Sequence, residues 1–275
     1  MYLSFDIGGT NMRLAVSKDG ETIDQIKIVP TPQDFETGIQ NIKQLADELS
    51  GGEKIIAVAG GVAGPIDKEK TMLVKSPHID GWINKPLKKE LENLFKAPVF
   101  LENDVALGGL GEAVLGAGKG FRIVAYLAIG TGVGSVRIVD GRIDRNTQGF
   151  EAGHQIILPD GEDCNCGGKG HLETLIGGYY LERKYHKAAS KIADPEIWNH
   201  VAYNLSLGLH NTIVHWSPEV IILGGSVTKS IPMDKVIGYV SDLLKIFPTA
   251  PKILTSSLGE SGLYGGLELI KQNKA

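Results

Sequence analysis

An internal repeat constrains the fold of this chain more than any other feature of its sequence. Residues 2–20 contain an apolar strand, a glycine turn, a second strand and a polar turn, and residues 123–141 repeat that order. Each copy begins with the pattern of a β-hairpin, so the repeat predicts two duplicated α/β domains. The repeat alone places the boundary between them near residue 105.

Strands and helices alternate around the two hairpins, as a mixed sheet flanked by helices requires. Apolar residues at helical spacing predict helices over 34–50 and 195–216, and a third that Pro86 can open. Further strands are expected at 55–59, 98–102 and 219–223. With 275 residues, the chain is long enough for two modest cores.

Charge and hydropathy argue against several kinds of partner. The net charge of −4, from 28 basic and 32 acidic residues, predicts neither a nucleic-acid nor a membrane partner. Apolar runs such as IIAVAGGVAG at 55–64 are too short to span a membrane. Because the first residues form a strand directly, we expect no signal peptide and a cytoplasmic location.

The glycine turns of both hairpins are suited to phosphate. In DIGGT, Gly8 and Gly9 let backbone N–H groups face an anion, and the Thr10 hydroxyl can add a hydrogen bond. A second cradle of the same kind is formed by Gly130, Thr131 and Gly132. Glycine hairpins also occur simply because strands must turn. Two copies, each with a threonine, favour nucleotide binding over that interpretation.

Asp6 ends the first strand and can hold Mg²⁺ through water, because Mg²⁺ keeps its hydration and takes few carboxylates. A Walker A motif is absent. Lys119 follows Gly118, but Ala113 and Gly120 occupy the other positions that the motif requires. The sequence therefore disfavours a P-loop fold.

The segment 151–173, EAGHQIILPDGEDCNCGGKGHLE, concentrates metal-binding side chains. It contains both cysteines of the chain, flanked by two histidines, and the candidate ligands are His154, Cys164, Cys166 and His171. Two thiolates and two imidazoles form a complete tetrahedral ligand set for zinc. Cysteines at this spacing are better interpreted as metal ligands in a reducing cytoplasm than as a disulfide. The alternative is a glycine-rich surface loop with two free thiols.

The same segment resembles the signature of the ROK family of sugar kinases, open reading frames and repressors. That signature is E-x-G-H followed by C-x-C-G-x-x-G-C-x-E, and the matching residues are Glu151, Gly153, His154, Cys164, Cys166, Gly167, Gly170 and Glu173. The chain departs from it at His171, where the family has its third cysteine. DIGGTN at 6–11, the glycine pair of IILGGS at 221–226 and the closing LYGGLELI at 263–270 also resemble family motifs.

This resemblance implies two RNase H-like domains of the actin-like ATPase fold, with mixed sheets flanked by helices and an interdomain cleft. The first domain would comprise residues 1–105, joined by a C-terminal helix at about 260–275. The second would comprise 106–259 with the zinc loop 151–173. The implied nucleotide-binding residues are Asp6, Gly8, Gly9, Thr10, Asn11, Gly130, Thr131, Gly132, Gly224 and Gly225.

The implied activity is that of a hexokinase that transfers the γ-phosphate of ATP to the 6-hydroxyl of an aldohexose. Its cofactors would be Mg²⁺ and structural Zn²⁺, its partners hexose and ATP, and its assembly a homodimer. Glucose is the first expectation. N-acetylmannosamine, N-acetylglucosamine, allose, fructose and β-glucosides stay open, because His78 replaces a family asparagine near the sugar.

Asp104, in the E-N-D sequence at 102–104, is the candidate catalytic base. Phosphoryl transfer to a hydroxyl needs a carboxylate that accepts the alcohol proton and aims its oxygen at the γ-phosphate. A purely structural alternative makes Asp104 a helix N-cap. The E-N-D match to the family's catalytic E-N-D favours catalysis.

The resemblance also implies a set of sugar ligands beside this base, namely Asn103, Asp104, Glu151, His154 and Glu173. His154 could serve zinc and sugar together, because its two ring nitrogens are distinct.

Two other classes of protein stay open. A sugar-sensing protein would bind hexose without phosphorylating it, but it need not retain Asp6, Asp104 and both phosphate turns. A phosphatase or ATPase of the wider superfamily would not need E-x-G-H. The repressors of the family carry an N-terminal winged helix, and no residues precede the first strand here to build one.

Overall fold

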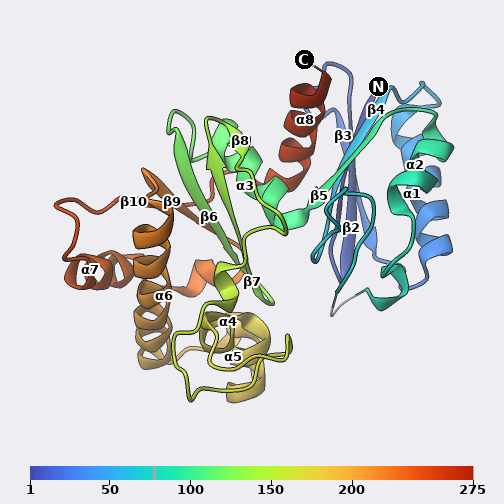
Figure 1. Ribbon diagram of the computed structural model, residues 1–275. Helices are drawn as coiled ribbons and strands as arrows, with labels where there is room; N and C mark the ends of the chain where they lie inside the picture. Colours follow the sequence, from blue (N-terminus) through green and yellow to red (C-terminus); the bar gives the residue numbers. More distant parts are fainter. Residues whose placement is uncertain (77–78, 275) are drawn as a thin grey trace. The chain divides into compact units, whose positions relative to one another are not determined.

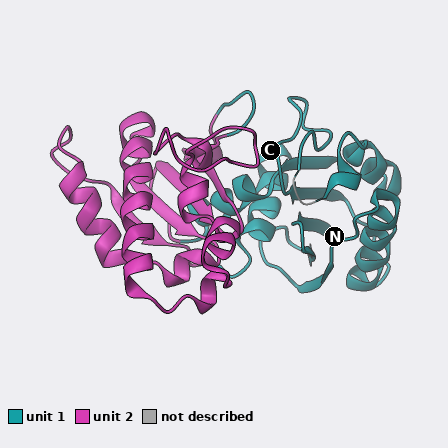
Figure 2. Ribbon diagram, turned by 90° about the horizontal axis from the view of Figure 1, so that it is seen from below, with its two compact units in different colours: residues 1–116, 145–149, 258–275 teal, residues 117–144, 150–257 magenta. Residues whose placement is uncertain are grey.

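The computed structural model describes residues 1–76 and 79–274, so His78 lies outside the described residues. The chain divides into two compact units (Figure 2). Unit 1 comprises residues 1–116, 145–149 and 258–275, and unit 2 comprises 117–144 and 150–257. Among the described residues, no helix combines the length and hydropathy that crossing a membrane would require.

Each unit contains one five-stranded mixed sheet. The strands of unit 1 are β1 (Tyr2–Ile7), β2 (Asn11–Ser17), β3 (Gln25–Pro30), β4 (Ala57–Val62) and β5 (Val99–Asn103). The strands of unit 2 are β6 (Ile123–Ile129), β7 (Val133–Val139), β8 (Arg142–Ile143), β9 (Val220–Gly224) and β10 (Lys252–Thr255).

The two sheets have the same topology, which confirms the duplication that the repeat predicts. Their orders are β3-β2-β1-β4-β5 and β10-β9-β6-β7-β8. In each sheet three antiparallel strands in chain order are extended, beside the first of them, by two parallel strands. The predicted fold class, mixed sheets flanked by helices, is therefore confirmed.

Helices flank both sheets (Figure 1). The helices of unit 1 are α1 (Phe35–Ser50), α2 (Leu87–Phe95), α3 (Asp104–Val114) and α8 (Ser261–Lys274). The helices of unit 2 are α4 (Leu172–Ile176), α5 (Gly178–Tyr185), α6 (Pro195–Trp216) and α7 (Met233–Leu243). Short 3-10 turns form at η1 (Asp80–Trp82), η2 (Ala152–His154), η3 (Ala189–Lys191) and η4 (Val227–Ser230).

The predicted helices form because their ends are specified locally. The Asp34 side chain accepts from the Thr37 N–H at the start of α1, and Gly51 ends the helix with a positive φ of 60°. Asp194 caps α6, with Pro195 in its first turn. The apolar faces of these helices pack on separate cores, around Trp82 in unit 1 and around the middle of α6 in unit 2.

Strand β4 begins two residues later than the strand predicted at 55–59 and continues past its predicted end. It contains the glycine pair Gly60 and Gly61, which directly follows that predicted end. Close approach explains both glycines. A Cβ at Gly60 would lie 2.2 Å from the Phe5 ring, and one at Gly61 would lie 2.7 Å from the Cα of Asp104. The glycines therefore continue the strand and bring the start of α3 against the sheet.

Helix α8 follows unit 2 in the chain but belongs to unit 1, where it packs along α3 and on β1 and β4. The Ser4 hydroxyl donates to the Leu263 carbonyl at 2.8 Å and joins α8 to β1. Because α3 packs on α8, the first compact unit extends to Gly116, whereas the repeat alone places the domain boundary near residue 105.

We expect Gly265→Ala to destabilise unit 1 by about 1–3 kcal/mol or more, the usual range for overpacking. A Cβ there would lie 1.9 Å from the carbonyl oxygen of Leu107 in α3, a backbone atom that cannot move aside easily. Gly238→Ala in α7 is the matched control, because no atom lies within 4 Å of that Cβ. Urea unfolding should show the control unchanged or slightly stabilised. Equal midpoints for Gly265→Ala and the wild type would contradict this packing.

Candidate functional site

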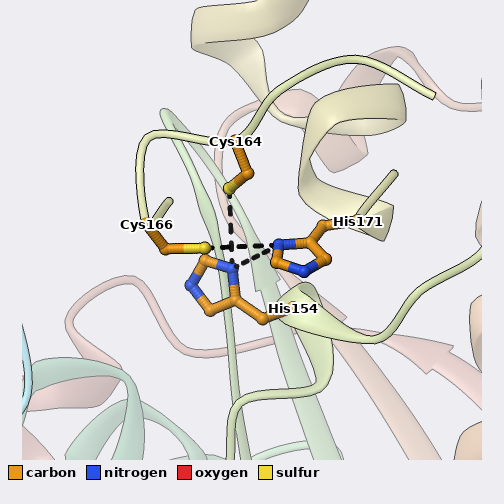
Figure 3. A group of neighbouring side chains, drawn as sticks. All are labelled: His154, Cys164, Cys166 and His171. Carbon is orange, nitrogen blue, oxygen red and sulfur yellow. Dashed lines mark hydrogen bonds between the residues drawn. The ribbon is translucent and has the colours of Figure 1, made fainter. Parts of the chain in front are cut away.

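Four side chains of unit 2 converge on one point: His154, Cys164, Cys166 and His171 (Figure 3). His154 comes from η2, the two cysteines from the loop that follows, and His171 from the N-cap position of α4. Their ligand atoms all lie within 4.8 Å of one another. Cys164 and His171 are buried, and Cys166 is exposed.

Three of the distances between these atoms match the ligand separations around a tetrahedral zinc ion. The two Nδ1 atoms lie 3.3 Å apart, and Sγ of Cys164 lies 3.7 Å from Nδ1 of His154. Sγ of Cys166 lies 3.4 Å from Nδ1 of His171. Zinc–ligand bonds of about 2.0–2.3 Å in a tetrahedron give ligand separations of about 3.3–3.8 Å.

Direct hydrogen bonds explain the cluster less well than a cation does. Each Nδ1 contacts two partners, yet a ring nitrogen offers only one in-plane position, as lone pair or as N–H. Burial lowers the pKa of His171, helped by the nearby His154, and this favours the neutral imidazole that binds metal. The residues present therefore fit zinc, in the ligand set that the sequence predicts.

Backbone hydrogen bonds fold the loop around the cysteines. The Cys164 N–H donates to the Gly168 carbonyl, and the Gly167 N–H donates back to the Cys164 carbonyl, at 2.8 and 2.9 Å. Gly170 has a φ of 67°, and a Cβ there would lie 1.7 Å from the carbonyl oxygen of Leu158. Glycine is therefore required at 170 for the chain to return from the loop to His171.

His154 faces the other residues of the His/Cys cluster with one ring nitrogen and the carboxylate of Glu151 with the other. Its Nδ1 points into the cluster, while its Nε2 lies 3.9 Å from Oε2 of Glu151. This arrangement leaves Nε2 available for an N–H that could donate to a sugar hydroxyl.

Glu173, on the first turn of α4, connects the metal loop to the second glycine turn. Its Oε2 accepts from the Val133 N–H at 2.8 Å, and a Cβ at Gly132 would lie 2.5 Å from the same oxygen. Its Oε1 lies 3.9 Å from Sγ of Cys164. The structure therefore brings Glu173 to both the proposed zinc ligands and the turn at 130–132.

The turn at 130–132 directs two of its carbonyl groups toward α5. The carbonyl of Gly130 accepts from the Gly178 N–H at 2.8 Å, and that of Thr131 accepts from the Tyr179 N–H at 2.9 Å. In a trans peptide the C=O and N–H groups point in opposite directions. The N–H groups of Thr131 and Gly132 therefore point away from α5, as a phosphate cradle needs.

Strand β9 ends in the glycine pair of the predicted adenosine motif, at the same end of the sheet as this turn. Strands β6 and β9 are parallel, with Ala128 opposite Gly224. Gly225 has a φ of 90°, and a Cβ there would lie 2.3 Å from the carbonyl oxygen of Ile129. The structure thus brings the glycine pair directly beside the start of the turn at 130–132.

In unit 1, the strand register places the remaining predicted site residues at the carboxyl ends of the parallel strands. Ile7, Val62 and Asn103 are aligned across β1, β4 and β5, which run parallel. The DIGGT turn follows the first of these strands, and Asp104 follows the third. Two strand spacings separate them, or about 10 Å.

Asp6 and the first glycine turn are held by local contacts. Oδ2 of Asp6 lies 3.3 Å from Nη1 of Arg13. Burial raises the pKa of the Asp6 carboxyl, and the Arg13 guanidinium opposes that rise. The Thr31 hydroxyl donates to the Gly8 carbonyl at 2.7 Å, so the N–H of Gly9 in the same peptide points the opposite way.

The N-cap of α3 is Asn103, not Asp104. Oδ1 of Asn103 accepts from the Ala106 N–H at 3.1 Å, and its Nδ2 donates to the Gly64 carbonyl at 3.2 Å. Asp104 is the first residue of the helix. The structural alternative for Asp104 is therefore wrong, because its neighbour has that role.

The sequence analysis missed two positioning contacts. The buried Glu102 pairs with Lys70 and accepts from the Asn103 N–H at 3.1 Å. Gln155 donates to the carbonyls of Ala152 and Gly208 and accepts from Asn211 of α6 at 2.9 Å. Only the E of E-N-D pointed toward the first contact, and nothing pointed toward the second.

Comparison with solved structures gives the class of protein. A ROK hexokinase from Thermus thermophilus superposes with a TM-score of 0.89 at 29% identity, over 100% of this chain and 99% of that one. A ROK glucokinase from Streptomyces griseus, in complex with glucose and AMPPNP, gives 0.84 at 26% identity, over 98% and 99%. The fold is that of ROK sugar kinases, an actin-like ATPase fold.

The model of the ROK family matches residues 2–273, and the chain belongs to this family. A glucokinase of Thermotoga maritima is 29% identical over 310 residues, covering 98% of this chain and 97% of that enzyme. Repressors also match: a xylose repressor of Bacillus subtilis is 28% identical over 78% of this chain and 61% of its own length.

Proposed function

We propose that this chain is an ATP-dependent hexokinase that phosphorylates the 6-hydroxyl of an aldohexose, with glucose as its first substrate. That it is a sugar phosphotransferase follows from its family and from glucokinase relatives that match almost its whole length. The observation that supports the finer proposal most is Asp104. Asp104 follows β5 at the end of the sheet where the DIGGT turn follows β1, and the N-cap of α3 is Asn103 rather than Asp104.

In this proposal each unit supplies part of the chemistry. Asp104 accepts the proton of the sugar 6-hydroxyl and aims its oxygen. The N–H groups of Gly9, Thr131 and Gly132 bind phosphate oxygens, and the glycine pair at 224–225 lets adenosine approach β9. Mg²⁺, when bound, neutralises charge on the phosphates, and Asp6 is the side chain that would hold it, through water.

Sugar recognition is assigned to Asn103 and Asp104 in unit 1 and to Glu151, His154 and Glu173 in unit 2. Zinc would fix the ring of His154 through Nδ1 and leave Nε2 beside Glu151, which faces the sugar. The metal then has a structural role, because it shapes the segments that hold sugar ligands without contacting the transferred phosphate.

The second candidate function is sugar sensing without phosphorylation, which the repressors among the relatives favour. Against it stand both phosphate turns and Asp104, which a sensor has no need to retain.

A homodimer remains part of the proposal, and light scattering after gel filtration would test it.

A coupled ADP-release assay tests the proposal. The purified protein would be assayed with ATP, Mg²⁺ and, in turn, glucose, N-acetylmannosamine, N-acetylglucosamine, allose, fructose and a β-glucoside. We expect ADP release with glucose at a kcat/KM above that for the other sugars. If ADP is released with only one of the other sugars, that sugar replaces glucose as the proposed substrate. Calorimetric sugar binding with no ADP release from any of them would favour the sensor.

A further inference from the structure

Tyr180 lies behind the cysteine loop, on a helix that contributes no metal ligand. It belongs to α5, and its side chain is 3% exposed. Its hydroxyl oxygen accepts from the Asn165 N–H at 2.8 Å. This buried hydroxyl therefore holds the backbone of the residue between the two cysteines.

We propose that Tyr180 is a positioning residue of the zinc site, which fixes the peptide between Cys164 and Cys166 and so sets the spacing of the two sulfur atoms. The inference rests on the zinc site of the proposed function. Outer partners of this kind hold metal-binding residues in place, and loss of such a partner typically costs about 10–100-fold in metal affinity or activity.

Residue 179 provides a matched control. Tyr179 precedes Tyr180 on α5, is 43% exposed, and stacks edge-to-face on it with ring centroids 5.1 Å apart. Tyr180→Phe and Tyr179→Phe each remove one hydroxyl and keep both rings. Only the first change removes the acceptor of the Asn165 N–H.

The test is zinc retention, measured by elemental analysis and by competition with a chromogenic chelator. We expect Tyr180→Phe to bind zinc about 10–100-fold more weakly than the wild type and Tyr179→Phe to match the wild type. In the cobalt-substituted protein, the thiolate-to-cobalt absorption band should shift for Tyr180→Phe alone. A general loss of packing would not produce that shift.

Two results would overturn the inference, and they are distinguishable. If wild type and Tyr180→Phe hold zinc equally tightly and their cobalt spectra coincide, the metal site stands but Tyr180 does not support it. If the wild type, purified without chelators, holds no zinc and takes up no cobalt, the metal site of the proposed function fails, and the role of Tyr180 fails with it.

Discussion

Replacing Asp104 with asparagine should lower kcat by about 10²–10⁴-fold while sugar affinity changes little, because an amide cannot accept the hydroxyl proton. The amide oxygen can still accept a hydrogen bond from the sugar, so binding survives. Asn103 remains the N-cap of α3, and the fold is therefore expected to persist. Initial rates with glucose, together with calorimetric titration of the sugar, measure the two effects separately.

Glu36→Gln is the matched control for this variant. Glu36 lies in the first turn of α1, so the substitution also removes a carboxylate near a helix N-terminus, where the charge is worth about 0.3–1 kcal/mol. The control should lose a similar small amount of stability and none of the activity. Near-normal turnover by Asp104→Asn would assign the base to another residue.

Removing zinc should raise the KM for the sugar by about 10–100-fold and lower the unfolding temperature only modestly. The loop from 155 to 171 folds on its own hydrogen bonds and on the cluster, whereas the core of unit 2 lies around α6. Without the metal, His154 would lose the bond that fixes its ring, and Glu173 would lose the fixed position of its neighbour Cys164. Steady-state kinetics before and after chelation, followed by zinc repletion, would measure this.

Position 171 offers a second check of the metal. His171→Cys restores the family signature, and we expect it to strengthen zinc retention without abolishing activity, because thiolate and imidazole are both tetrahedral zinc ligands. Elemental analysis of protein purified without chelators decides the underlying question. Stoichiometric zinc supports the four ligands, and its absence would leave Cys164 and Cys166 as free thiols.

Much of the fold could be predicted because the signals are local. Helical spacing predicted α1 and α6 at nearly their observed bounds, and the repeat predicted the shared topology. Strand β3 was not predicted, although Gln25 and Lys27 alternate with Ile26 and Ile28 as in a strand. In the structure most of its residues are exposed. The end of β4 was missed because glycines at 60 and 61 resemble a turn until Phe5 and the start of α3 are seen against them.

The residues of the candidate site could also be predicted only in part. The four members of the His/Cys cluster could be named from the sequence because cysteine and histidine are chemically distinctive and lie within one loop. Asn103 and Asp104 were identified together, but which of them caps α3 depends on backbone geometry. Tyr180 and Gln155 could not be found, because tyrosine and glutamine are common and their partners are set by how α5 and α6 pack.

The position of α8 has a consequence for the order in which the chain can fold during synthesis. Unit 1 begins at the first strand, yet α8, which covers part of β1 and β4 and packs along α3, is translated only after the whole of unit 2. A nascent chain therefore leaves the surfaces of α3, β1 and β4 that α8 covers exposed until α8 has been synthesised. Every residue of unit 2 precedes α8 in the chain, so unit 2 can complete its core before unit 1 does.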